Sequence, residues 1–172
     1  SSSDEITTSY LKYVGLDASF NPSLDSNGSV ASAIELLNEV KEFGGPGTIA
    51  AVAAMTTAIQ TKLSCDDDAT TTTTTTSSSN QIKLTGYNGL MLPLCEDLRL
   101  AQLAVEDKIT ISQLLNVSSV CGVGIDTVPI AGNTCPNELA SLLLDVVGLA
   151  QRWNKPLSCR VFPVPGKVIG DR

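Results

Sequence analysis

Histidine is absent from this chain of 172 residues, and aromatic residues make up only 4% of it. The chain therefore has no Ser–His or Cys–His nucleophile pair, no imidazole acid–base group and few of the ligands that zinc prefers. Basic residues are also scarce, because 11 Lys and Arg stand against 18 Asp and Glu, a net charge of −7. Nucleic acids and anionic membranes attract proteins with surplus positive charge, so we expect no nucleic-acid and no membrane partner.

Long apolar runs are missing as well, since none approaches the roughly 20 residues that cross a membrane. No signal region follows Ser1, and the five cysteines are widely spaced without a C-x-x-C pair, which favours reduced thiols. We therefore expect a cytoplasmic protein. Hydrophobic residues make up 42% of the chain, which is typical of a folded domain. Both ends look cut, so residues 1–172 are predicted to form one partial domain of a longer protein.

The apolar pattern predicts strands that alternate with helices. Extended runs are predicted over 13–18, 89–92, 119–128 and 157–162, each followed by a proline-containing break. Helices are predicted over 30–40, 48–60, from 96 onward, over 110–115 and over 136–153. This alternation indicates an α/β fold with mostly parallel strands. Residues 66–80 are almost entirely Asp, Thr and Ser, with no large apolar group to bury, and we predict a disordered insertion there.

A glycine-rich turn precedes the helix that is predicted to start at residue 48. Gly45, Gly47 and Thr48 are candidates for binding an anion, because backbone N–H groups at a helix start attract negative charge. The Lys-Ser/Thr ending of a P-loop is missing, so a plain turn between two helices is the alternative.

Two acidic residues and one cysteine are candidate catalytic residues. Asp126 is predicted near the end of a strand, where open α/β sheets place their sites, and Asp17 near the end of another. If the two carboxylates meet, they could share a proton or hold a divalent cation. Cys121 is a candidate nucleophile, although no cation adjacent in sequence lowers its pKa, and a structural role is the alternative.

Basic residues follow the last predicted strand. Arg160 and Lys167 suit a phosphate or carboxylate group, and the alternative for Lys167 is a solvated side chain.

Six motifs occur in order along the chain: 15–19 (GLDAS), 43–48 (FGGPGT), 86–93 (GYNGLMLP), 120–129 (VCGVGIDTVP), 154–157 (NKPL) and 163–167 (PVPGK). The series resembles domain of unknown function 711, also called uncharacterised protein family 0210. The resemblance implies part of an α/β barrel like that of pyruvate formate-lyase, a homo-oligomer, and a C-terminal portion of a longer chain. The glycyl-radical loop of the formate-lyases is missing, so no glycyl radical is expected and the cofactor stays unknown.

Two functions follow from these observations. In the first, the protein is an enzyme that acts on a small anionic metabolite, with Asp17 and Asp126 doing acid–base or cation chemistry and the 45–48 turn and Lys167 holding the anion. In the second, it is a non-catalytic small-molecule-binding or regulatory protein. A fold alone does not decide between them.

Overall fold

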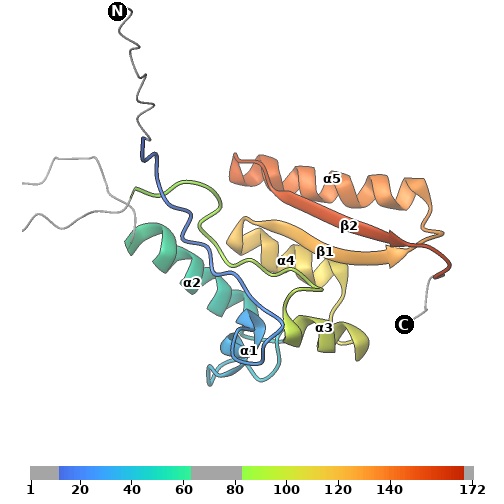
Figure 1. Ribbon diagram of the computed structural model, residues 1–172, viewed down its shortest axis with the longest axis horizontal. Helices are drawn as coiled ribbons and strands as arrows, with labels where there is room; N and C mark the ends of the chain where they lie inside the picture. Colours follow the sequence, from blue (N-terminus) through green and yellow to red (C-terminus); the bar gives the residue numbers. More distant parts are fainter. Residues whose placement is uncertain (1–11, 63–82, 169–172) are drawn as a thin grey trace, which may run out of the picture.

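The computed structural model describes residues 12–62 and 83–168, so the insertion predicted over 66–80 lies outside the described residues. Within the described ranges the chain forms five helices and two strands (Figure 1). In chain order they are α1 (Val30–Glu35), α2 (Thr48–Lys62), α3 (Leu98–Val105), α4 (Ile111–Cys121), β1 (Gly124–Ala131), α5 (Pro136–Trp153) and β2 (Ser158–Val164).

The helix starts follow local capping chemistry. Thr110 accepts a hydrogen bond from the Gln113 amide, and the Gln113 side chain accepts one from the Thr110 amide, which forms a capping box at the start of α4. Helix α5 covers the predicted residues, with Pro136 in its first turn and Asn154 in a left-handed conformation at its end. Asp97 caps α3 through the amides of Arg99 and Leu100.

The two strands are parallel neighbours, paired from Gly124 opposite Ser158 to Ala131 opposite Val164. The sequence pattern predicted that each strand ends at its proline, and this prediction is wrong for both strands. Pro129 lies opposite Phe162, and Pro163 lies opposite Ile130, inside the paired region. Proline is tolerated in a strand where its missing N–H is not needed by a neighbour.

Other predicted strands are shorter or absent. The runs predicted over 13–18 and 89–92 contain no regular strand, only parallel bridges of Leu16 with Leu84 and of Phe20 with Leu90. Residues 119–121 belong to α4 rather than to a strand, and the first predicted helix ends at Glu35 instead of continuing to 40. A further parallel bridge joins Pro93 to Asp126, so two irregular extended segments continue the β2–β1 array.

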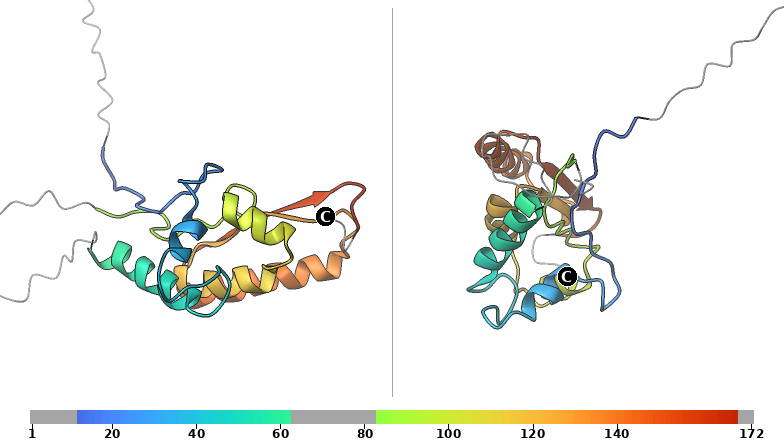
Figure 2. Two further views of the ribbon diagram at one scale, coloured as in Figure 1. Left: turned by 90° about the horizontal axis from the view of Figure 1, so that it is seen from below. Right: turned by 90° about the vertical axis from the view of Figure 1, so that its left-hand side faces the viewer.

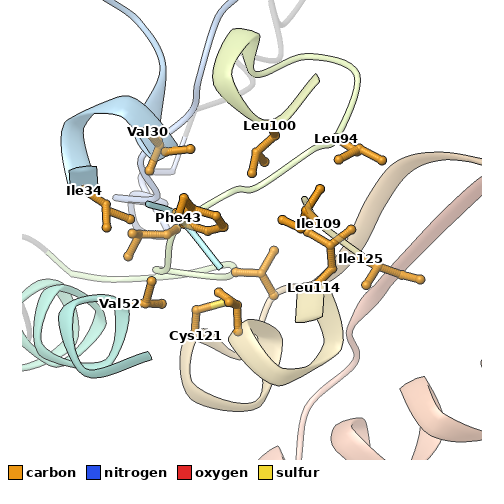
Figure 3. Close-up of a cluster of buried hydrophobic side chains, with 14 of the residues drawn as sticks. Val30, Ile34, Phe43, Val52, Leu94, Leu100, Ile109, Leu114, Cys121 and Ile125 are labelled. Atoms are coloured by element: carbon orange, nitrogen blue, oxygen red, sulfur yellow. The ribbon is translucent and has the colours of Figure 1, made fainter. Parts of the chain in front are cut away.

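The helices lie mainly on one side of this array. Figure 2 (right) shows α2, α4 and α5 together on one side of the strands, with α1 and α3 below. Side chains from α1, α2, α3, α4 and β1 meet in one apolar cluster, in which Phe43, Ile34 and Leu100 are almost fully buried (Figure 3). Cys121 is part of this cluster, 1% exposed.

The fold is thus a mixed α/β structure with a parallel sheet, as the alternating pattern predicted. The described residues contain a sheet of two regular strands and no closed barrel. The barrel like that of pyruvate formate-lyase therefore stays a prediction.

Candidate functional site

Three neighbouring segments bring charged side chains into a row. Glu96 comes from the segment that pairs with β1 at Pro93, Asp126 from β1 and Arg160 from β2. The Arg160 guanidinium donates from Nε to Asp126 Oδ1 and from Nη2 to Asp126 Oδ2, the latter over 2.8 Å. Nη2 also donates to Glu96 Oε1 over 3.3 Å. This Glu96–Asp126–Arg160 row links all three segments across the sheet.

The members of the row differ in exposure. The Asp126 side chain is 6% exposed, whereas those of Arg160 and Glu96 are 53% and 52% exposed. A carboxylate so deeply buried needs a charged partner, and the forked guanidinium supplies one with two parallel hydrogen bonds. The hydrogen bond to Asp126 raises the pKa of Arg160 above its already high value. Asp126 therefore holds a permanently charged guanidinium at the surface.

Backbone irregularity surrounds Asp126. The register of β1 and β2 shifts between Ile125 and Val128, and Thr127 has a φ of 46°, in the left-handed region that β-branched residues avoid. The Thr127 amide donates to Asp126 Oδ1 over 2.9 Å, and its hydroxyl accepts from the Cys95 amide over 3.2 Å. Strained conformations of this kind cluster at ligand and catalytic sites. Asp126 was predicted near the end of its strand, but it is the third residue of β1, because β1 continues past Pro129.

Asp17 lies in a different environment. Its carboxylate accepts hydrogen bonds from the Ser19 hydroxyl and from the amides of Ser19, Tyr87 and Asn88, over 2.6–3.1 Å. Burial raises the pKa of Asp17, but these hydrogen bonds outweigh it and leave the pKa below its ordinary value. Among the described residues the hydrogen bonds of Asp17 and those of Asp126 go to different partners. A joint role of the two carboxylates stays a prediction.

Lys155 interacts electrostatically with both Cys121 and Asp17. Lys155 Nζ donates to the Tyr87 carbonyl over 3.0 Å and lies 5.7 Å and 5.5 Å from the ring centres of Tyr87 and Trp153. Burial lowers the pKa of Lys155, and the negative charge of Asp17 partly opposes this. Burial also raises the pKa of Cys121 to about 11, so its thiol is protonated at neutral pH.

The glycines around Cys121 make room for the protein's own atoms. A Cβ on Gly122 would lie 2.8 Å from the Trp153 ring, and one on Gly124 would lie 2.1 Å from the Ser158 carbonyl oxygen. Gly124 has a φ of 106°, and Gly122 ends α4 in the left-handed region. Close packing between segments of this chain explains both positions.

The predicted anion-binding turn is internally hydrogen bonded. The Thr48 hydroxyl accepts from the Gly44 amide over 3.0 Å, and the Thr48 amide donates to the Gly45 carbonyl over 3.3 Å. Thr48 is 1% exposed, and Gly47 has a φ of 91° with its α-carbon against the Glu39 carbonyl. These contacts describe a closed turn between two helices. The anion-binding role of Gly45, Gly47 and Thr48 stays a prediction.

Lys167 follows β2 and lines a cavity of about 880 Å³. The cavity lies between the segment joining α3 to α4, the end of β1 and the first half of α5, and its walls are mostly apolar. Asp107, Glu138 and Asp145 also line it. The role of Lys167 in anion binding stays a prediction.

Sequence reasoning identified Asp126 and Arg160 separately but not their pairing, and it missed Glu96, Thr127 and Lys155. Glu96 and Arg160 are 64 residues apart in sequence, so no local pattern connects them.

The residues of 12–62 and 83–168 form no group of three or more cysteines and carboxylates that could hold a metal ion. No helix among these residues is long and apolar enough to span a membrane.

The fold and this row of charges define the chain as a mixed α/β protein with a buried carboxylate–guanidinium pair on a parallel sheet. Comparison with known proteins adds the family. The sequence model of the family described as "Uncharacterised ACR (DUF711)" matches residues 3–172, and the chain belongs to this family.

Curated relatives carry the matching name. A "UPF0210 protein" of Pyrobaculum arsenaticum is 33% identical over 161 residues, which cover 94% of this chain and 33% of the relative. One from Oenococcus oeni is 30% identical over 156 residues, covering 91% and 32% of the two chains. The chain therefore spans about one third of the length of these relatives. No solved structure matches it.

Proposed function

We propose that the protein is an enzyme that acts on a small anionic metabolite, with Arg160 as the residue that binds the anionic group. The observation that carries this proposal is the half-exposed guanidinium fixed in place by buried Asp126. Asp126 occupies Nε and one Nη2 hydrogen, whereas Nη1 has no hydrogen-bond partner among the described residues. An incoming carboxylate or phosphate can accept from Nη1 without breaking the pair with Asp126.

The residues around Arg160 have distinct roles in this proposal. Asp126 is a positioning residue, because its two oxygens orient the guanidinium. Thr127 positions Asp126 in turn, through its amide and its strained backbone. Restricting the guanidinium in advance lowers the entropy lost when the anion binds.

One observation favours the alternative, a non-catalytic binding protein. The thiol of Cys121 is protonated at neutral pH, and both oxygens of Asp126 are bound to Arg160. Neither group is then available as a base or a nucleophile. The catalytic roles of Asp17, Asp126 and Cys121 therefore depend on which of the two functions is correct.

The test is a screen of carboxylates and phosphates against the 172-residue chain, with binding measured by thermal shift and turnover by NMR. Arg160→Lys keeps the charge but loses the fork, and it should weaken binding roughly tenfold or more. Arg152→Lys, which makes the same change at an exposed position in the last turn of α5, is the matched control. Unchanged affinity in Arg160→Lys would refute the proposal. Binding without turnover would identify the alternative.

A further inference from the structure

We propose that the anionic metabolite also carries an amino group, so that the Glu96–Asp126–Arg160 row binds a zwitterion of the α-amino acid class. This inference rests on the proposed function, because it places the anionic group of the ligand on Arg160.

The first argument is the charge of the row. Arg160 supplies one positive charge, and Asp126 and Glu96 supply two negative charges within hydrogen-bond distance of it. The row therefore has one net negative charge before any ligand arrives. A simple anion would add a second negative charge beside Glu96, and like charges at this distance repel each other. A ligand that brings its own positive charge avoids this repulsion.

The second argument is the set of unused atoms. Within the described part of the chain, Glu96 uses only Oε1, which accepts from Arg160 Nη2, and Oε2 has no hydrogen-bond partner. Nη1 of Arg160 likewise has none there. One free donor group and one free carboxylate oxygen thus lie on side chains that contact each other. An α-amino acid carries a carboxylate and an ammonium on the same carbon atom, which matches this neighbouring donor and acceptor.

The third argument is access. Within the row the Asp126 side chain is buried, and the side chains of Glu96 and Arg160 are each about half exposed, at 52% and 53%. Ligand contacts with these two residues therefore need no rearrangement of the buried pair. Preference for an amino acid over a carboxylate without an amino group comes from Glu96, since Arg160 would bind the carboxylate of either ligand.

The experiment compares three pairs of ligands that differ by the amino group: L-alanine and propionate, L-glutamate and glutarate, and L-leucine and 4-methylpentanoate. Binding to the 172-residue chain is measured by NMR titration, following the backbone signals of β1 and β2. The amino acid of a binding pair should bind roughly two- to fivefold more tightly, which is the contribution of one exposed ion pair.

The variants separate this inference from the proposed function. Glu96→Gln should reduce the ratio of the two affinities to about one, while the ligands without an amino group still bind. Glu39→Gln, which makes the same charge change at an exposed position outside the row, should leave the ratio unchanged. Equal or tighter binding of the deamino ligands, or an unchanged ratio in Glu96→Gln, would overturn the zwitterion. The proposed function survives that result if Arg160→Lys weakens binding of the deamino ligands. If no pair binds, the zwitterion is overturned, and the screen of phosphates and other carboxylates then decides the proposed function. If Arg160→Lys changes no affinity, both are overturned.

Discussion

Replacing Asp97 with asparagine should destabilise the fold by about 3–6 kcal/mol. Asp97 is fully buried at 0% exposure, and its carboxylate begins two helices at once. Its oxygens accept five hydrogen bonds over 2.6–3.2 Å, from the Ser29 hydroxyl and the amides of Val30, Ala31, Arg99 and Leu100. Helices α1 and α3, which are remote in sequence, therefore share one capping side chain, and the ion pair of Glu35 with Arg99 joins them as well.

The magnitude follows from the donors that lose their acceptor. In asparagine an NH₂ group, which cannot accept a hydrogen bond, replaces one of the two carboxylate oxygens. If it replaces Oδ2, the amides of Val30 and Ala31 lose their acceptor. If it replaces Oδ1, the other three donors lose theirs. Two lost hydrogen bonds to a charged acceptor, at about 1.5–3 kcal/mol each, give the range stated. For a chain of this size each kcal/mol lowers the melting temperature by roughly 2–4 °C.

Urea unfolding followed by circular dichroism measures the free energy of unfolding directly. Asp145→Asn is the matched control, because this aspartate is exposed on α5, and it should stay within about 0.5 kcal/mol of the wild-type protein. The slope of the free energy against urea should be the same in all three proteins. An Asp97→Asn variant as stable as the control would refute the assignment of Asp97 as a shared cap.

Three further predictions concern the other titratable and glycine positions. Gly86→Ala should cost about 1–3 kcal/mol in a urea melt, because Gly86 has a φ of 82° and a Cβ there would lie 2.3 Å from Asp17 Oδ2; a neutral result would contradict this packing. Asp17→Asn should destabilise the protein at neutral pH, and the difference from wild type should shrink as the pH falls below about 4, since a folded-state pKa below the unfolded one contributes stability only while the carboxylate is ionised. A difference that is constant between pH 2 and 7 would contradict the hydrogen bonds as its source. At pH 7.5 iodoacetamide should modify exposed Cys135 well before buried Cys121, whose thiol has a pKa of about 11, and mass spectrometry of the digested protein would show the reverse order if Cys121 were activated.

Helices with strong local signals were predictable from the sequence. The bounds of α5 agree with the prediction over 136–153, since Pro136 and the spacing of apolar residues are local features. The start of α4 is likewise set by a local feature, the capping box of Thr110 and Gln113, and the helix predicted over 110–115 begins there but continues to Cys121. Gly122 ends this helix in the left-handed region, whereas residues 119–121 were predicted to be extended.

Pairing between distant segments was not predictable. Residues 13–18 were predicted to be an extended run, but only Leu16 forms a bridge, and whether such a segment becomes a regular strand depends on the neighbour it meets. The same limit applies to the site. The sequence indicates an acidic residue in a strand at Asp126, but its partner Arg160 is 34 residues away. The positive φ of Thr127 could not be predicted either, because β-branched residues rarely adopt it.

The long sequence separation of the contacts made by residues 13–20 has a kinetic consequence. Leu16, Ala18 and Phe20 are bound by hydrogen bonds to residues about 70 positions later in the chain, whereas β1 and β2 are joined through one intervening helix. Contacts that close a shorter loop form earlier, so the β1–α5–β2 unit should assemble first and the 13–20 segment should dock onto residues 83–90 last. Under native conditions the same segment should open most easily, and its amides should exchange with deuterium long before those of β1.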